Sequence, residues 1–133
     1  MLLMRALHLK ETGMAEPIPP VAVTHFKDIR IVEFTNNRIL DEANITEIGN
    51  TLTSLIEERE NPKVLLDFAA VDHLSSAALG TLINANNKIR ERGGQLRLTN
   101  IKPQILEVFV ITKLNKLFKI LPTRDEAIAS FNQ

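Results

Sequence analysis

Hydrophobic residues change their spacing several times along the chain, and each change predicts a new element. In residues 21–34, valine, isoleucine and phenylalanine alternate or cluster around the polar pair Lys27 and Asp28, which predicts a β-hairpin. In residues 45–56, apolar side chains recur every three or four positions, which predicts a helix with one buried face. Asp41 precedes this segment and is a suitable residue for the helix N-cap.

The middle of the chain predicts a strand that leads through a short loop into a second helix. The apolar run 64–68 shows little alternation, as expected for a central strand covered on both faces. Pro62 separates this run from the preceding helix. Periodic apolar positions resume after Ser75 and Ser76, and the helix is expected to end at the glycine pair 93–94 in a left-handed cap.

The last third of the sequence alternates strand and helix signals. Residues 95–99 alternate in hydrophobicity and predict a strand, and Pro103 suits the first turn of a third helix. Residues 117–121 predict a short strand, and Thr123 a cap for the final helix. The predicted order is β-β-α-β-α-β-α-β-α. It indicates an α/β domain in which about four helices pack on a mixed, largely parallel sheet.

The length of 133 residues suits one domain, which we place at residues 21–133. Residues 1–20 contain three prolines and a glycine between positions 13 and 20, which disfavours helix and central strand. We therefore expect an N-terminal arm or leader that adds little to the core.

Composition excludes several classes of function. Lys plus Arg and Asp plus Glu each number 16, so no net charge favours nucleic acid or an anionic membrane. The chain has no cysteine, which excludes disulfides and thiolate zinc sites. No segment approaches the roughly 20 unbroken apolar residues of a membrane-spanning helix, and the first ten residues lack the pattern of a secretory signal. We expect a cytoplasmic protein without a membrane span.

Catalytic motifs are weak. Asp67, Asp72, His73 and Ser76 lie close in sequence, but no G-x-S-x-G elbow surrounds the serine, and nothing in the spacing directs the histidine toward it. Asp72 and His73 are too few ligands for a metal site. Dinucleotide and P-loop glycine motifs are absent. We therefore predict no enzyme activity, no metal and no cofactor.

Three smaller features give local expectations. Asp67 ends an apolar strand and is expected to accept N–H bonds from the following loop. Gly80, inside the second helix, is expected to let a neighbouring element approach closely. Lys113, Lys116 and Lys119 are interpreted as a solvated face, with a patch for an acidic partner as the alternative.

The serine pair at the start of the second helix has a structural and a functional interpretation. Serine is a preferred N-cap, worth about 1 kcal/mol over alanine, so one of Ser75 and Ser76 is expected to cap the helix. A helix N-terminus also accommodates a phosphate, which adds about −1.5 to −2 charges facing free N–H groups and the positive end of the dipole.

These segments together resemble the STAS domains, and within them the bacterial anti-sigma factor antagonists. The resemblance covers about residues 21–131. It rests on VLLDF (64–68) and SSAALG (75–80), with supporting matches at residues 40–41, 92–94, 101–103 and 114–118. It implies a mixed sheet with helices packed against it, in agreement with the hydrophobic pattern.

The family motif also implies a modification site. In such antagonists it commonly reads Asp-Ser-Ser/Thr-Gly-Leu-Gly, and a partner anti-sigma kinase phosphorylates the serine after the aspartate. Leu79 and Gly80 fix the register here. The phosphorylated serine then corresponds to Ser76, while Ser75 stands in place of the aspartate and Ala78 in place of the first glycine.

The resemblance implies a non-enzymatic switch. Its partner would be an anti-sigma factor with a histidine-kinase-like ATPase fold, and phosphorylation of Ser76 would end binding. A STAS subunit of a sensory complex, binding other partners or a small ligand, is the alternative, and a hydrolase using Ser76 is the rival from another class. We expect a monomer or weak homodimer and no direct contact with nucleic acid. The expected partner-binding residues are Asp41, Ser75, Ser76, Ala77, Leu79 and Gly80.

Overall fold

The computed structural model describes residues 19–35, 37–39 and 42–131. Its elements are β1 (Val21–Phe26), β2 (Ile29–Phe34), β3 (Arg38–Ile39), α2 (Glu42–Glu57), β4 (Lys63–Asp67), β5 (His73–Leu74), α3 (Ser76–Glu91), β6 (Gln95–Thr99), α4 (Pro103–Ile111), the 3-10 helix η1 (Leu114–Lys116), β7 (Lys119–Leu121) and α5 (Arg124–Ser130). Within the described residues, no helix is both long enough and apolar enough to cross a membrane.

Five strands form one mixed sheet in the order β1-β2-β4-β6-β7. Strands β1 and β2 form an antiparallel hairpin, and every other neighbouring pair in this sheet is parallel. The predicted fold class and order of main elements are therefore confirmed. Three short elements were not predicted: η1, and the strands β3 and β5, which pair in parallel as a separate two-stranded sheet. The last strand begins at Lys119, two residues later than predicted, because residues 114–116 form η1.

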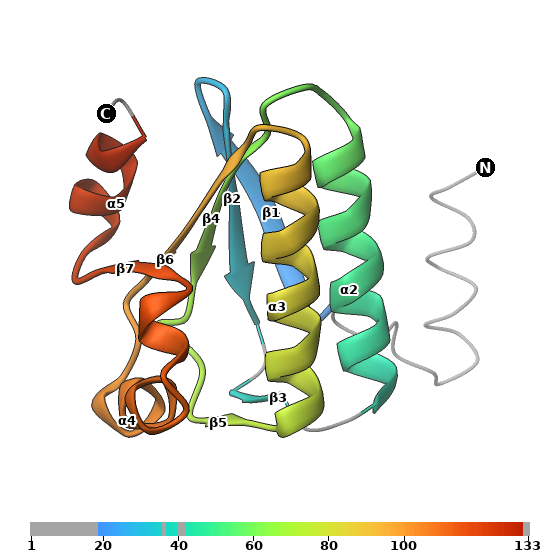
Figure 1. Ribbon diagram of the computed structural model, residues 1–133. Coiled ribbons are helices and arrows are strands. Elements are labelled where there is room, and N and C mark those ends of the chain that lie inside the picture. Colours follow the sequence, from blue (N-terminus) through green and yellow to red (C-terminus); the bar gives the residue numbers. More distant parts are fainter. Residues whose placement is uncertain (1–18, 36, 40–41, 132–133) are drawn as a thin grey trace, which may run out of the picture.

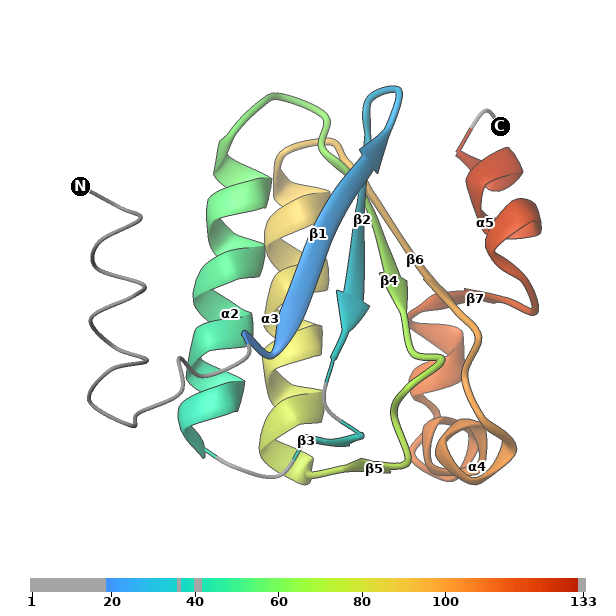
Figure 2. The same cartoon turned by 180° about the vertical axis from the view of Figure 1, so that it is seen from behind.

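Helices cover both faces of the main sheet. Helices α2 and α3 lie side by side on one face, and α5 lies on the other side (Figures 1 and 2). On the central strand β4, Val64 and Leu66 belong to the larger core, while Leu65 joins a smaller core under α5. The prediction of a strand buried on both faces is confirmed.

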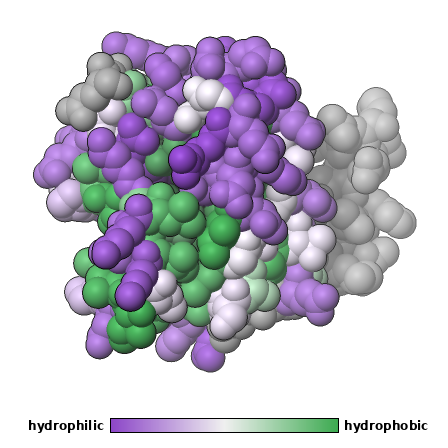
Figure 3. Space-filling model, viewed as in Figure 1, coloured by the Kyte–Doolittle hydropathy of each residue, from purple (hydrophilic) through white to green (hydrophobic). Residues whose placement is uncertain are grey.

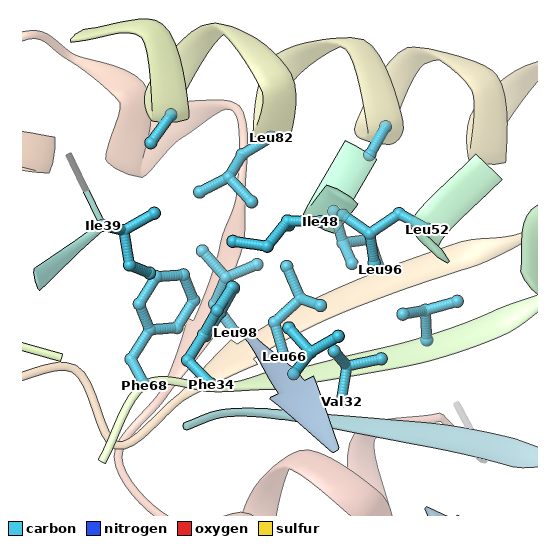
Figure 4. Packing of buried hydrophobic residues seen from close by; sticks show 14 of the residues in the cluster. Val32, Phe34, Ile39, Ile48, Leu52, Leu66, Phe68, Leu82, Leu96 and Leu98 are labelled. Carbon is cyan, nitrogen blue, oxygen red and sulfur yellow. The ribbon is translucent and has the colours of Figure 1, made fainter. Parts of the chain in front are cut away.

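A chain of aromatic contacts extends the larger core toward α4. Phe34 and Phe68 lie together beneath α3 (Figure 4), with ring centroids 4.8 Å apart. Phe68 meets Phe109 of α4 edge to face at 6.3 Å, and Phe109 meets Phe118 at 5.7 Å. These contacts hold α4 at the end of the sheet through one side of the helix, since only Ile105 and Phe109 of α4 are buried.

Asp67 fixes the end of β4. Its side chain is 5% exposed and accepts a hydrogen bond from the backbone N–H of Ala69 at 2.9 Å, as predicted. It also accepts bonds from the side chains of Asn100 at 3.2 Å and Arg124 at 2.6 Å, which the sequence did not reveal. The same guanidinium lies 2.8 Å from Glu33, and these two carboxylates raise the pKa of Arg124, Glu33 most strongly.

The C-terminal helix α5 is held at both ends. Thr123 caps its N-terminus as predicted, accepting from the N–H of Glu126 at 3.2 Å. Near its C-terminus, the buried Arg97 of β6 donates to the hydroxyl of Ser130 at 2.9 Å and lies over the ring of Phe131. Burial lowers the pKa of Arg97. Its side chain therefore anchors α5 to the sheet instead of facing water.

The glycines after α3 have the expected role. Gly93 has a φ of +72°, in the left-handed region that ends many helices. A side chain at Gly94 would clash with the carbonyl oxygen of Pro62, which accepts a hydrogen bond from the N–H of Gln95 at 2.8 Å. This pair therefore sets the turn from α3 into β6.

Candidate functional site

The small β3–β5 sheet positions the start of α3. The N–H groups of Asp72 and His73 donate to the carbonyl oxygen of Asn37 at 2.7 and 3.1 Å. Two residues after His73, the N–H of Ser75 donates to the carbonyl oxygen of Ile39 at 3.1 Å. These bonds place the loop before α3 beside the segment that leads into α2. The N-termini of the two helices consequently lie at the same end of the molecule (Figure 1).

Ser75 is the N-cap of α3. Its backbone is extended, and its side-chain oxygen accepts a hydrogen bond from the N–H of Ala78 at 3.1 Å. The expectation that one of the two serines caps the helix is confirmed, and the cap is Ser75. Ser76 is the first residue of α3 and is exposed. We call Ser75, Ser76, Ala77 and Gly80 the Ser76 corner.

The electrostatic surroundings of Ser76 favour an anion. The first turn of α3 contains no acidic residue. A negative group on Ser76 would face the N–H groups and the positive end of the helix dipole without a competing carboxylate on that turn. No hydrogen bond within the described residues joins Ser76 to Asp72 or His73, so neither is held as a base for its hydroxyl.

Asp72 has a structural partner instead. Its carboxylate forms an ion pair with the ammonium group of Lys102, at the start of α4, and lies 3.5 Å from the side-chain nitrogen of Asn37. The hydrogen bond from Lys102 lowers the pKa of Asp72, although partial desolvation acts in the opposite direction. The ion pair thus ties α4 to the loop that precedes the Ser76 corner.

Gly80 differs from its sequence-based expectation. Among the described residues, no atom lies within 4 Å of a Cβ built on Gly80, so the glycine does not serve the close approach of another described element. That prediction was wrong. Ala77, one turn earlier, is exposed. The start of α3 therefore presents a partly exposed surface of small side chains.

The other residues expected to bind a partner are Leu79 and Asp41. Leu79 is 9% exposed and packs in the larger core, so it orients α3 and is not part of the exposed Ser76 corner. Ala78 is also buried. Asp41, expected to cap α2 and to bind a partner, lies outside the described residues. The sequence also missed the β3–β5 support, because each of these strands is two residues long.

Comparisons with known proteins identify the family of the chain. The model of the STAS domain family matches residues 20–127. The chain is 29% identical over 93 residues to the putative anti-sigma factor antagonist BtrV of Bordetella bronchiseptica, covering 70% of this chain and 79% of that protein. It is 19% identical over 113 residues to the anti-sigma F factor antagonist of Paenibacillus polymyxa, covering 85% and 92%.

Solved structures share the fold. An anti-sigma-factor antagonist (STAS) domain protein from Planctomyces limnophilus superposes with a TM-score of 0.76 at 22% identity, over 85% of this chain and 98% of that chain. The phosphorylated form of the Bacillus cell fate determinant SpoIIAA gives a TM-score of 0.64 at 15% identity, over 83% and 97%.

Proposed function

Since the chain belongs to the STAS domain family, we propose that it is an anti-sigma factor antagonist that binds its partner through the Ser76 corner. The observation that carries this proposal is that only one of the two adjacent serines caps the helix. Ser75 caps α3, which leaves the exposed hydroxyl of Ser76 without a structural duty in the cap. Ser76 is therefore able to carry a modification without the loss of the helix N-cap.

The switch is phosphorylation of Ser76 by an ATP-using kinase. The Ser76 oxygen attacks the γ-phosphorus of ATP, the bond to the ADP oxygen breaks, and the hydroxyl proton passes to a base on the kinase. The kinase is the partner itself, an anti-sigma factor with a histidine-kinase-like ATPase fold. The product carries about −1.5 to −2 additional charges on the first turn of α3.

This charge affects folding and binding differently. In the free protein, the phosphate meets water, the N–H groups of the first turn and the positive dipole end, so the fold tolerates it. In the complex, a partner seated on Ser76, Ala77 and Gly80 would have to desolvate the charge. That penalty is several kcal/mol when no cation meets it. Unphosphorylated protein binds the anti-sigma factor and frees the sigma factor, and phosphorylated protein does not.

The site supports binding better than catalysis. The small side chains of the Ser76 corner form a surface that a partner helix or loop can approach closely, whereas Asp72 is occupied by Lys102. We therefore propose a non-enzymatic protein, a monomer or weak homodimer, that works in the cytoplasm where sigma factors act. The proposed role involves no direct contact with nucleic acid.

The direct test is phosphoryl transfer. The purified chain is incubated with Mg-ATP and a candidate anti-sigma factor of the histidine-kinase-like ATPase type, and the modified residue is mapped by mass spectrometry. We expect one phosphoryl group on Ser76 in the parent and in Ser75→Ala, and none in Ser76→Ala. Phosphate on Ser75, or no transfer despite a stable complex, would overturn the proposed switch.

A further inference from the structure

Helix α4 exposes an apolar face that no described element of the chain covers. Leu106, Val110 and Ile111 are 37%, 52% and 72% exposed. They are three of the five large apolar side chains that are exposed among the described residues, and all three lie on one nine-residue helix. Scattered exposed apolar residues are ordinary, but a group on one element marks an interaction surface.

This face borders a groove at the edge of the main sheet. The groove lies between α4 and the edge strand β7 and has a volume of 560 Å³. In Figure 3, a hydrophobic region occupies the part of the surface where Figure 1 places α4 and β7, with hydrophilic side chains across it. The lining residues are Ile101, Leu106, Val110, Asn115, Ile120, Leu121 and Pro122.

Three lysines lie close in sequence to residues that line the groove. Lys116 and Lys119 are sequence neighbours of the lining residues Asn115 and Ile120, and Lys113 follows α4. All three lysines are exposed, and none has an ion-pair partner among the described residues. Residues 103–121 contain these three lysines and one carboxylate, Glu107, so their net charge is 3 − 1 = +2 in a chain whose total is zero.

We propose that the α4–β7 groove binds an amphipathic helix of a partner protein that carries acidic residues beside its apolar face. Such a helix would bury Leu106 and Val110 with its apolar residues, and its carboxylates would meet the flanking lysines. The groove is a second binding surface, separate from the Ser76 corner.

The charges argue against two other occupants. In a two-fold symmetric dimer, a second copy of the chain would bring Lys113, Lys116 and Lys119 against the same lysines, which is unfavourable. The chain's own residues 1–18 carry two basic and two acidic side chains, so they offer no acidic excess. The described chain begins near the opposite edge of the sheet, where the carbonyl oxygen of Pro20 accepts from the N–H of Thr35.

A lipid surface fits the groove less well than a helix does. Apolar residues with lysines can bind anionic membranes, but such binding uses a protruding face that enters the headgroup region. Here Leu106 and Val110 line a hollow beside β7. A groove of this form accepts the ridge of a helix.

The groove and the Ser76 corner lie on different sides of α4. A separate hollow of 340 Å³, lined by Ile105 and Val108 of α4, faces residues 72–74 just before the corner. Leu106 and Val110 do not line that hollow. A substitution at Val110 therefore alters the groove without touching the corner, and the two proposals can fail independently.

The test is selection from a yeast-displayed library of 18-residue helices with a fixed leucine face and flanking positions randomised between Glu and Lys. The labelled full chain is the bait. We expect Glu-rich helices to be enriched. These helices should bind the Val110→Gln variant about tenfold more weakly than the parent, since burying a valine contributes about 1.5 kcal/mol. Val23→Gln is the matched control, because Val23 is exposed at 41% on β1, away from the groove. It should bind like the parent.

A triple charge reversal, Lys113→Glu, Lys116→Glu and Lys119→Glu, should invert the selection toward Lys-rich helices. This readout does not depend on the apolar substitution. The proposal is overturned if no helix is enriched, if Glu and Lys are enriched equally, or if Val110→Gln and Val23→Gln weaken binding to the same extent. Flotation with phosphatidylserine vesicles accompanies the selection, and vesicle binding abolished by Val110→Gln without any helix selection would assign the groove to membranes instead.

Discussion

The side-chain oxygen of Ser75 accepts a hydrogen bond from the backbone N–H of Ala78 at 3.1 Å. This bond completes the first turn of α3 and makes Ser75 the N-cap. Ser76, the next residue, is exposed and takes no part in the cap. The capping role therefore belongs to Ser75, and the regulatory role that we propose falls on Ser76.

The first prediction concerns the stability of α3. Ser75→Ala should lower the free energy of unfolding by about 1 kcal/mol because it removes the cap. Ser76→Ala should change it by less than about 0.5 kcal/mol because Ser76 is an exposed helical residue. Urea denaturation of the two variants and the parent measures both values. A larger loss for Ser76→Ala than for Ser75→Ala would reassign the cap.

The second prediction follows from the open space around Gly80. Alanine there should raise the free energy of unfolding by about 0.5 to 1 kcal/mol, since glycine is unfavourable inside a helix and an added Cβ would meet nothing. Gly49→Ala in α2 is the matched control, because its Cβ would lie 3.3 Å from the methyl carbon of Thr81. The control should gain less than Gly80→Ala.

The Gly80→Ala variant can also be tested in partner binding. If a partner approaches α3 closely, the more stable Gly80→Ala variant should bind the anti-sigma factor more weakly than the parent, by about tenfold. Isothermal titration measures this change. Unchanged affinity would place Gly80 outside the contact surface.

The third prediction distinguishes two carboxylates that share Arg124. Asp67→Ala should cost about 2 to 4 kcal/mol, because Asp67 is 5% exposed and its loss removes the acceptor of three part-buried hydrogen bonds. Glu33→Ala should cost less than about 1 kcal/mol, because the Glu33 side chain is 46% exposed. Denaturant unfolding of the two variants tests the contrast, and equal losses would contradict it.

The location of the damage from Asp67→Ala is also predictable. Because Asp67 bonds to Ala69, Asn100 and Arg124, its removal should loosen the loop after β4, the loop after β6 and the start of α5. Hydrogen exchange should quicken in α5 as well as near residues 69–75. Faster exchange confined to the Ser76 corner would show that the Arg124 bond matters little.

Local patterns predicted the main elements well, because their signals lie within a few residues. Apolar spacing located α2 and α3, turn residues located the β1–β2 hairpin, and Thr123 marked the start of α5. Interactions between distant residues were missed. The ion pair of Arg124 with Asp67 joins residues 57 positions apart, and no periodicity encodes such a pair. Arg97 alternates like a solvent-facing strand residue, yet α5 covers it.

The candidate site was predictable only in part for the same reason. The motif around Ser76 is local and was visible, but the strands β3 and β5 that hold it come from two segments more than 30 residues apart. The expectation for Gly80 failed because a glycine in a helix does not show, from sequence alone, which element lies against it. Nothing within the described chain approaches it.

The fourth prediction concerns the N-terminal arm. Deleting residues 1–18 should shift the thermal midpoint by less than about 4 °C, the shift that roughly 1 kcal/mol produces. Deleting residues 1–20 should cost more, because the carbonyl oxygen of Pro20 accepts a hydrogen bond from Thr35 at 2.9 Å and Pro20 is buried. Calorimetry compares the two truncations. A loss of about 10 °C or more in the shorter deletion would show that the arm packs as part of the domain.

The central claim is that Ser76 controls binding without controlling folding, and one titration tests it most directly. The parent, Ser76→Ala and Ser76→Asp are titrated calorimetrically with the histidine-kinase-like anti-sigma factor in the presence of ADP, so that no phosphoryl transfer occurs, and each is melted alongside. We predict equal melting midpoints and equal affinities for the parent and Ser76→Ala. For Ser76→Asp we predict an unchanged or slightly higher midpoint with affinity lowered about a hundredfold, because its charge must be desolvated. A folded Ser76→Asp that binds as tightly as the parent would contradict the account.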